Sequence, residues 1–291
     1  MTAPLQPKAP AADRNPAPVK VDVDVTHRYG DLVVHEDIKF SVRENEFLCI
    51  CGPSGCGKTT LLDILAGILA PSRGGVRIGG HPVDPKRDSI SFVFQEPSTL
   101  PWLGVRDNIA TGLRIKNVPA AEIARRVDDI TGIVGLKGYE NYYPHQISGG
   151  MKQRVAIARA FATDADLILM DEPFVSLDQP TRERMQREVL DIWRHRLRTV
   201  VFVTHNLEEA VFLGDRIIIL SAKPARIVAD FEIPLSRPRD PLAPEFTRIR
   251  AQCAQWLHAI QSDASVVAMP DGSAVSEGWP CGIGPDMTSK P

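Results

Sequence analysis

One stretch, from Gly52 to Thr60, constrains this chain more than any other part of the sequence. Its first eight residues fit the phosphate-binding loop pattern G-x-x-x-x-G-K-[ST]. An apolar run over 46–51 precedes it, and apolar residues at helical spacing follow over 61–69, which predicts strand, loop and helix in that order. The alternative is an ordinary glycine-rich turn with a solvated lysine, and the flanking strand and helix argue against it.

The chemistry expected of the stretch comes from its backbone. Glycines let the main chain curl so that successive N–H groups point at a polyphosphate, and the helix N-terminus adds free N–H groups and partial positive charge. Lys58 is expected between the β- and γ-phosphates, and the Thr59 hydroxyl is expected on Mg²⁺. The predicted nucleotide site consists of Gly52, Pro53, Ser54, Gly55, Cys56, Gly57, Lys58, Thr59 and Thr60.

The cysteines do not indicate a disulfide framework, because their count is odd and nothing in the sequence indicates secretion. They are Cys49, Cys51, Cys56, Cys253 and Cys281. Cys49 and Cys51 are predicted to be small apolar residues of a strand rather than metal ligands, since no histidine or further cysteine stands near them. Cys56 lies beside Lys58 at a helix N-terminus, where a thiolate is favoured. We therefore hypothesise that oxidation or alkylation of Cys56 blocks nucleotide binding.

Composition excludes several classes of protein. The formal net charge is −2, which gives neither the basic surface of a nucleic-acid-binding protein nor a polybasic membrane anchor. No apolar run approaches the roughly 18–20 residues that span a bilayer, and the N-terminus lacks the apolar core of a signal peptide. The sequence therefore predicts a cytosolic location and no nucleic-acid partner.

The chain divides into three parts by composition. Residues 1–18 contain five prolines and are predicted to be a disordered leader. Residues 19–262 are predicted to form the folded domain, with a helical subdomain over about 100–160. Residues 263–291 lack periodicity and are predicted to be a flexible tail. Within the folded part, alternating residues over 21–42 and 75–79 predict a small antiparallel sheet, and the remaining pattern is that of an α/β protein.

Polar side chains follow several buried strands of the expected main sheet. Gln95 comes after an apolar run over 89–94, Asp171 and Glu172 after one over 167–170, and His205 after one over 199–203. The carboxyl ends of such strands are where α/β sheets present ligands. Asp171 is expected to hold Mg²⁺, and Glu172 to accept a proton from, or orient, the attacking water. Gln95 is as well explained as a loop residue, and an isolated histidine is more often structural.

Two further features stand outside these strand ends. Ser148, Gly149 and Gly150 open a helix that runs to about Phe161, which predicts a second anion-binding helix N-terminus in the chain. Tyr29 lies before a Gly-Asp turn, where its ring could stack on a flat base, although the residue alone is better explained as a surface tyrosine.

The order of these motifs resembles one family, the ATP-binding cassette ATPases, over about residues 19–240. The resemblance implies a P-loop, RecA-like core with an antiparallel β-subdomain and an inserted helical subdomain. It implies that Tyr29 stacks on adenine, that Gln95 contacts Mg²⁺ and the attacking water, and that Asp178 and His205 are the aspartate and switch histidine of the site. Met151 and Val175 depart from the commonest family pattern, although Ser148 and Asp178 remain in place.

The resemblance also implies partners. In this family the phosphate loop of one copy faces the signature helix of a second copy, so that Ser148 would meet the γ-phosphate held by Lys58 of the other chain. Residues 94–102 and 234–240 are similar to those of ATPase subunits from nitrate, sulfonate and taurine importers. The expected partners are a second copy, a transmembrane permease that docks near Trp102 and, indirectly, a solute-binding protein, at the cytoplasmic face of the cell membrane. An exporter subunit, and more remotely a cassette acting on nucleic acid or ribosomes, remain the alternatives.

Overall fold

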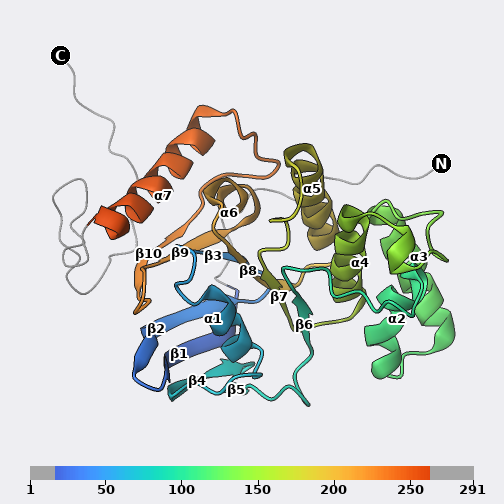
Figure 1. Cartoon of the computed structure of the whole chain (residues 1–291), viewed down its shortest axis with the longest axis horizontal. Coiled ribbons are helices and arrows are strands. Elements are labelled where there is room, and N and C mark those ends of the chain that lie inside the picture. The colour runs from blue at the N-terminus through green and yellow to red at the C-terminus, as the bar shows by residue number, and fades with distance from the viewer. Residues whose placement is uncertain (1–16, 263–291) are drawn as a thin grey trace.

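The computed structural model describes residues 17–262, which form two β-sheets surrounded by helices (Figure 1). The predicted leader and tail lie almost wholly outside the described residues. The larger sheet has the strand order β10-β9-β3-β8-β7-β6, and the smaller one β2-β1-β4-β5. The strands of the larger sheet are β3 (Phe47–Cys51), β6 (Ile90–Val93), β7 (Leu167–Asp171), β8 (Thr199–Thr204), β9 (Arg216–Leu220) and β10 (Ile227–Glu232).

The larger sheet is parallel except for its edge strand β10. Its strands read as unbroken apolar runs because both of their faces are covered. In β3, Leu48 and Ile50 pack into the core that contains the first helix of the chain, whereas Phe47, Cys49 and Cys51 pack into the core on the other face. The prediction that the two cysteines are core residues of a strand is therefore confirmed.

The smaller sheet is antiparallel, as the alternating pattern predicts. It consists of β1 (Val19–Tyr29), β2 (Leu32–Arg43), β4 (Arg73–Ile78) and β5 (His81–Pro82). The second strand, β2, is continuous, and its register against β1 shifts on either side of His27. Asp37 has a left-handed φ of 52° within this strand, which interrupts the alternation without ending the pairing.

Helix α1 (Lys58–Leu65) lies between the two sheets and joins them into one body (Figure 1). Leu61, Leu62 and Leu65 contact residues of both sheets in a single buried cluster. The helix is shorter than the expected span of 61–69. It begins three residues earlier because the phosphate loop passes directly into its first turn, and it ends before Gly67, which has a left-handed φ of 69°.

Three helices form a separate group beside the larger sheet, at the right of Figure 1. They are α2 (Val105–Ile115), α3 (Ala120–Ile133) and α4 (Gly149–Ala162), with a short 3₁₀ turn, η1 (Pro144–Gln146), before α4. Buried apolar residues recur along their inner faces at helical spacing, as predicted, and α4 also packs against β6 and helix α5 (Gln179–His195).

The C-terminal part of the described chain covers the face of the larger sheet that lies opposite α1, in the same core as α4 and α5. Helix α6 (Leu207–Leu213) packs on β3 and β8, and α7 (Pro244–Ser262) packs on α6 and β9. Buried Arg239 joins these elements, because one of its guanidinium nitrogens donates to the carbonyls of Val211 and Gly214, each at 2.6 Å, at the C-terminal end of α6. Burial lowers the pKa of Arg239 to about 10. The charged group thus caps the helix end and interacts favourably with its dipole.

Replacing Arg239 by methionine is expected to lower the free energy of unfolding by about 2–3 kcal/mol, because buried carbonyl groups lose a charged donor. Urea unfolding followed by circular dichroism measures the change. The matched control is Arg250→Met, which removes an exposed ion pair between Arg250 and Glu208 at 3.1 Å and should cost less than about 1 kcal/mol. Equal stability of the two variants would contradict the capping role.

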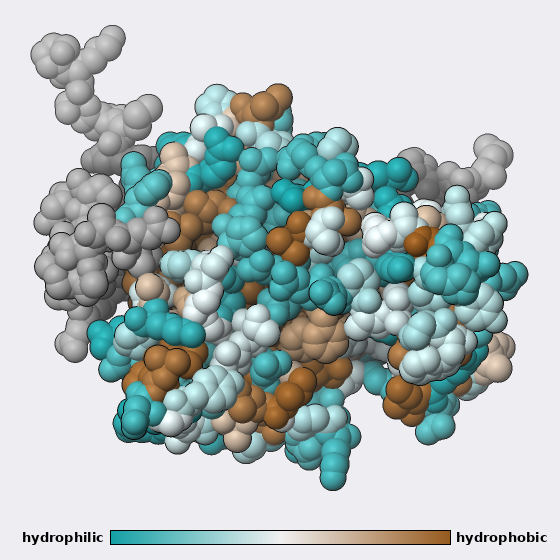
Figure 2. Space-filling view, in the orientation of Figure 1, coloured by the Kyte–Doolittle hydropathy of each residue, from teal (hydrophilic) through white to brown (hydrophobic). Residues whose placement is uncertain are grey.

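The surface mixes polar and apolar residues. Figure 2 shows hydrophilic residues over most of one face, interrupted by smaller hydrophobic groups, several of them over the region of α1 and the antiparallel sheet. Within residues 17–262, no helix combines the length and the apolar character needed to cross a membrane.

Candidate functional site

The carboxyl ends of β3, β7 and β8 converge on the loop between β3 and α1. The loop curls through two left-handed glycines, Gly55 at φ 78° and Gly57 at φ 106°. A side chain at Gly52 would lie 2.9 Å from the Cys56 sulfur, and one at Gly57 would lie 2.6 Å from a methyl group of Val34. The glycines of the pattern are therefore required for close approach as well as for backbone conformation.

Lys58 reaches back across the loop that precedes it. Its ammonium donates to the carbonyl oxygens of Gly52 at 3.0 Å and Pro53 at 3.1 Å, and lies 3.5 Å from a carboxylate oxygen of Glu172. The side chain is 6% exposed. A cation held at the center of a curled backbone is the arrangement that receives a phosphate chain.

Thr59 and Asp171 form a pair of oxygen ligands beside the lysine. The Thr59 hydroxyl donates to Asp171 Oδ2 at 2.7 Å. Burial raises the pKa of Asp171, an effect opposed by the Thr59 hydrogen bond and the nearby Lys58 charge. A hydroxyl and a carboxylate at this distance are the donor types that Mg²⁺ prefers, so these residues fit the predicted metal site.

Glu172 follows β7 and adopts a left-handed φ of 42°, which is unusual for a glutamate. The strand alternation therefore ends at Asp171, the last residue of β7. Glu172 instead turns toward His205, whose Nδ1 lies 2.8 Å from Glu172 Oε2. Both carboxylates contact the start of α1, and the structure brings together the acids and the histidine that the sequence singles out.

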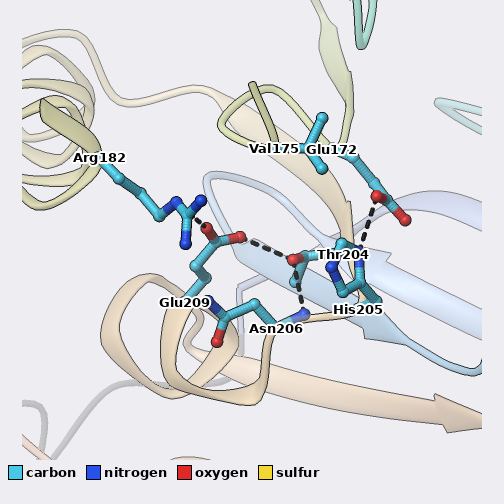
Figure 3. Close-up of a pocket in the computed structure, with 7 residues that line it drawn as sticks. All are labelled: Glu172, Val175, Arg182, Thr204, His205, Asn206 and Glu209. Carbon is cyan, nitrogen blue, oxygen red and sulfur yellow. Dashed lines mark hydrogen bonds and ion pairs between the residues drawn. The ribbon is translucent and has the colours of Figure 1, made fainter. Parts of the chain in front are cut away.

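A small cavity adjoins Glu172 and His205, and its other side is lined by polar groups that the sequence analysis missed (Figure 3). Thr204 donates its hydroxyl to buried Glu209 at 2.7 Å, and Arg182 lies 3.7 Å from the same carboxylate. Burial raises the pKa of Glu209. The sequence does contain a signal for Glu209, because it is an acidic residue in the first turn of the helix that follows His205.

Gln95 and Tyr29 lie exposed near this edge of the molecule. Val93 pairs with Met170 in the parallel ladder, so the chain two residues further on places Gln95 level with Glu172. Tyr29 ends β1, is 53% exposed and packs edge-on against His27, with ring centroids 4.7 Å apart. About half of Tyr29 is thus accessible to a ligand.

The second predicted anion site, at Ser148, Gly149 and Gly150, is the N-terminus of α4, as expected, but in the described part of the chain it is not joined to the phosphate-binding loop of the same chain. Exposed Ser148 caps α4 by accepting a hydrogen bond from the Met151 amide at 3.3 Å. Within residues 17–262, no hydrogen bond or ion pair joins Ser148, Gly149 or Gly150 to the phosphate loop. Asp178 caps α5 in the same way, by accepting from the Thr181 amide. The hydrogen bond from Thr181 lowers the pKa of Asp178.

The expectation of a reactive thiolate at Cys56 is wrong. Its side chain is 1% exposed and packs in the α1 cluster. Burial raises the pKa of the Cys56 thiol, and this effect exceeds the opposing effect of Lys58. The position beside a helix N-terminus therefore does not make the sulfur nucleophilic, because desolvation disfavours the thiolate.

Comparisons with known proteins point to a single protein family. The model of the ABC transporter family matches residues 35–175. The aliphatic sulfonates import ATP-binding protein of Bacillus subtilis is 45% identical over 217 residues, which are 75% of this chain and 84% of that protein. The taurine import ATP-binding protein of Pelagibacter ubique is 43% identical over 69% of this chain and 76% of that protein.

The fold is also similar to that of a solved ATP-binding cassette, described as a dimeric post-hydrolysis state bound to ADP and phosphate. Its TM-score is 0.64 at 31% identity, over 74% of this chain and all of that one. The predicted fold class, a P-loop core with an antiparallel subdomain and a helical insertion, is therefore confirmed. Together with the identities above, this establishes that the chain belongs to the ATPases of the ABC transporter family.

Proposed function

We propose that the chain is the ATP-hydrolysing subunit of a membrane importer for nitrate, a sulfonate, taurine or a related small solute. The observation that carries this proposal is the meeting of Lys58, the Thr59–Asp171 pair and the Glu172–His205 pair at one strand edge. The names of the relatives that share this cassette support the importer assignment.

In the proposed mechanism the loop amides and Lys58 bind the phosphates of ATP. Thr59 and Asp171 would hold Mg²⁺, with Gln95 as a further oxygen ligand, and the ion would neutralise charge on the β- and γ-phosphates. Glu172 accepts a proton from the attacking water, and His205 orients the Glu172 carboxylate through their 2.8 Å contact. Tyr29 stacks on the adenine ring.

A second copy of the chain completes the site in this proposal. Ser148 and the first amides of α4 form an exposed helix N-terminus, which suits a γ-phosphate held by the other copy. Asp178, exposed at the start of α5, would lie in the same interface. Support comes from the similar cassette, whose post-hydrolysis state was solved as a dimer. ATP would then hold the two copies together, and hydrolysis would release them.

The segment after Gln95 is proposed to receive the permease. It is fixed from within, since buried Asn108 exchanges hydrogen bonds with both backbone groups of Leu100, and Arg159 donates to the backbone and hydroxyl of Ser98. The indole of Trp102 is nevertheless 70% exposed. A large exposed apolar group on a rigid support is suited to binding a partner. The chain would thereby lie at the cytoplasmic face of the membrane, with a solute-binding protein as an indirect partner.

Growth of a strain that lacks the gene tests the proposed solute class. We expect loss of growth on taurine or an alkanesulfonate as sole sulfur source, or on nitrate as sole nitrogen source, with normal growth on sulfate and ammonium. The wild-type gene should restore growth, and a gene carrying Glu172→Gln should not. Unimpaired growth on all of these sources would contradict the import proposal and favour an exporter.

A further inference from the structure

Two buried histidines lie next to the phosphate loop and are not explained by the proposed mechanism. His27 of β1 and His35 of β2 face each other in the register of the antiparallel sheet. They are 4% and 0% exposed. Within the described chain, both ring nitrogens of His27 and Nδ1 of His35 have no hydrogen-bond partner. Buried polar groups that forgo partners are costly, so their presence calls for a reason.

The one hydrogen bond of this pair goes to the loop itself. Nε2 of His35 lies 3.0 Å from the carbonyl oxygen of Gly57, which also accepts the Leu61 amide of α1 at 2.9 Å. A carbonyl can only accept, so Nε2 carries the proton and donates, and Nδ1 is an acceptor in the neutral ring. This contact is close: a side chain at Gly57 would come within 2.8 Å of the same nitrogen.

The direction of the Gly57 carbonyl fixes the direction of the next amide. In a planar trans peptide, the C=O of one residue and the N–H of the next point in opposite directions. Holding the Gly57 oxygen against His35 therefore turns the Lys58 N–H away from the sheet, toward the side on which the loop binds phosphate. A left-handed glycine has little conformational preference of its own, so this orientation depends on the two groups that donate to the oxygen, the Leu61 amide of α1 and His35 Nε2.

We propose that His35 is a positioning residue for the phosphate-binding loop, which acts by donating from Nε2 to the Gly57 carbonyl. The proposal rests on the proposed nucleotide site at Gly52–Thr60 and assigns to it a residue outside the recognised motifs. The chain over 34–36 is sealed from the other side by Ala225, which pairs with Val34 and Glu36. The backbone on either side of His35 is therefore fixed by hydrogen bonds to Ala225.

The same ring makes the folded chain sensitive to protons. Burial lowers the pKa of His35, the Gly57 hydrogen bond opposes this shift, and the charges of His27 and Lys223 lower the pKa further. The neighbouring Cys56 thiol stays neutral, since burial raises its pKa. A second proton would have to reside on Nδ1, which has no acceptor. Protonation of the ring should therefore destabilise the folded chain, beginning as the pH falls below about 6.5, the ordinary pKa of a histidine, and the loss of stability is complete below the lowered pKa.

Calorimetric titration with Mg·ADP tests the proposal, because ADP reports on the loop without hydrolysis. His35→Leu removes the donor but keeps an apolar group, and we expect a dissociation constant about 5-fold higher, the effect of one net hydrogen bond. His35→Gln keeps an N–H donor near the position of Nε2 and should restore most of the affinity. The control His195→Leu changes an exposed histidine of α5 and should bind like the wild type.

A pH series separates this role from packing. Between about pH 7.5 and 5.5 the wild type should lose more of its free energy of unfolding than His35→Gln, as measured by urea unfolding, because only the wild type has the buried His35 imidazole to protonate. Equal losses in the two proteins, or equal binding of Mg·ADP by His35→Leu and the wild type, would overturn the proposal. Equally weak binding by the leucine and glutamine variants would do so too. Failure of the wild type to bind Mg·ADP would instead contradict the nucleotide site itself.

Discussion

Glu172→Gln should lower ATP hydrolysis by about 10²- to 10⁴-fold, the range expected when a general base is removed. Glutamine keeps the size of the side chain and can still contact His205, but it cannot accept a proton from water. Nucleotide binding should persist, because Lys58 retains both loop carbonyls as partners and gains freedom from its 3.5 Å contact with the carboxylate.

Phosphate release measures turnover in this variant, and size-exclusion chromatography in Mg·ATP measures association of the two copies. We expect a stable ATP-bound dimer, since the step that separates the copies is blocked. Glu183→Gln, a change on the surface of α5, is the control and should hydrolyse ATP normally. Normal turnover by Glu172→Gln would exclude Glu172 as the base.

Ser148→Arg should lower turnover by about 10²-fold or more, because a hydroxyl donor at the proposed γ-phosphate position is lost. The arginine also places positive charge at the positive end of α4. Ser148 is exposed, so the fold should lose no more than about 1 kcal/mol from the missing helix cap. Ser148→Thr keeps both hydroxyl and cap and should be nearly as active as the wild type.

Mixing two inactive variants distinguishes a shared site from a site within one chain. A dimer of one Ser148→Arg copy and one Glu172→Gln copy contains one shared site in which both residues are intact. Activity should therefore reappear on mixing. If each chain hydrolyses ATP alone, every chain in the mixture carries a defect and the mixture stays inactive.

The sequence was sufficient for the parts of the site that depend on local pattern. The phosphate-binding loop needs glycine at positions 52 and 57, and Asp171 and Glu172 follow a strand that is buried on both faces. Both features have a sequence pattern of their own, so the pattern was enough to locate these residues. Spacing could not give the φ of 42° at Glu172, which depends on the hydrogen bond between its amide and the Val203 carbonyl of the next strand. That contact orients Glu172 toward His205 and not away from it.

His35 was missed for a related reason. In β2 the inward positions are Ile38, Phe40 and Val42, and continuing that alternation would place residue 35 on the exposed face. Val34 is buried as well, in phase with those positions, so both faces of β2 are covered around residues 34 and 35. The covering groups, the Gly57 carbonyl and the chain around Ala225, come from distant parts of the sequence. No local pattern contains that information. The same limit applies to Cys56, whose local motif indicates a reactive thiol while the surrounding core prevents one.

The position of α1 between the two sheets affects how the gene should respond to mutation. Leu61, Leu62 and Leu65 face away from the phosphates and belong to the core that joins both sheets. Substitutions at these leucines should lower the amount of folded protein in cells, because they weaken the packing between the two sheets. Substitutions at Lys58 and Thr59 should leave the amount of protein nearly unchanged but abolish growth that depends on its activity. A deep mutational scan that scores abundance and growth in parallel would thus divide one short helix into a structural half and a chemical half.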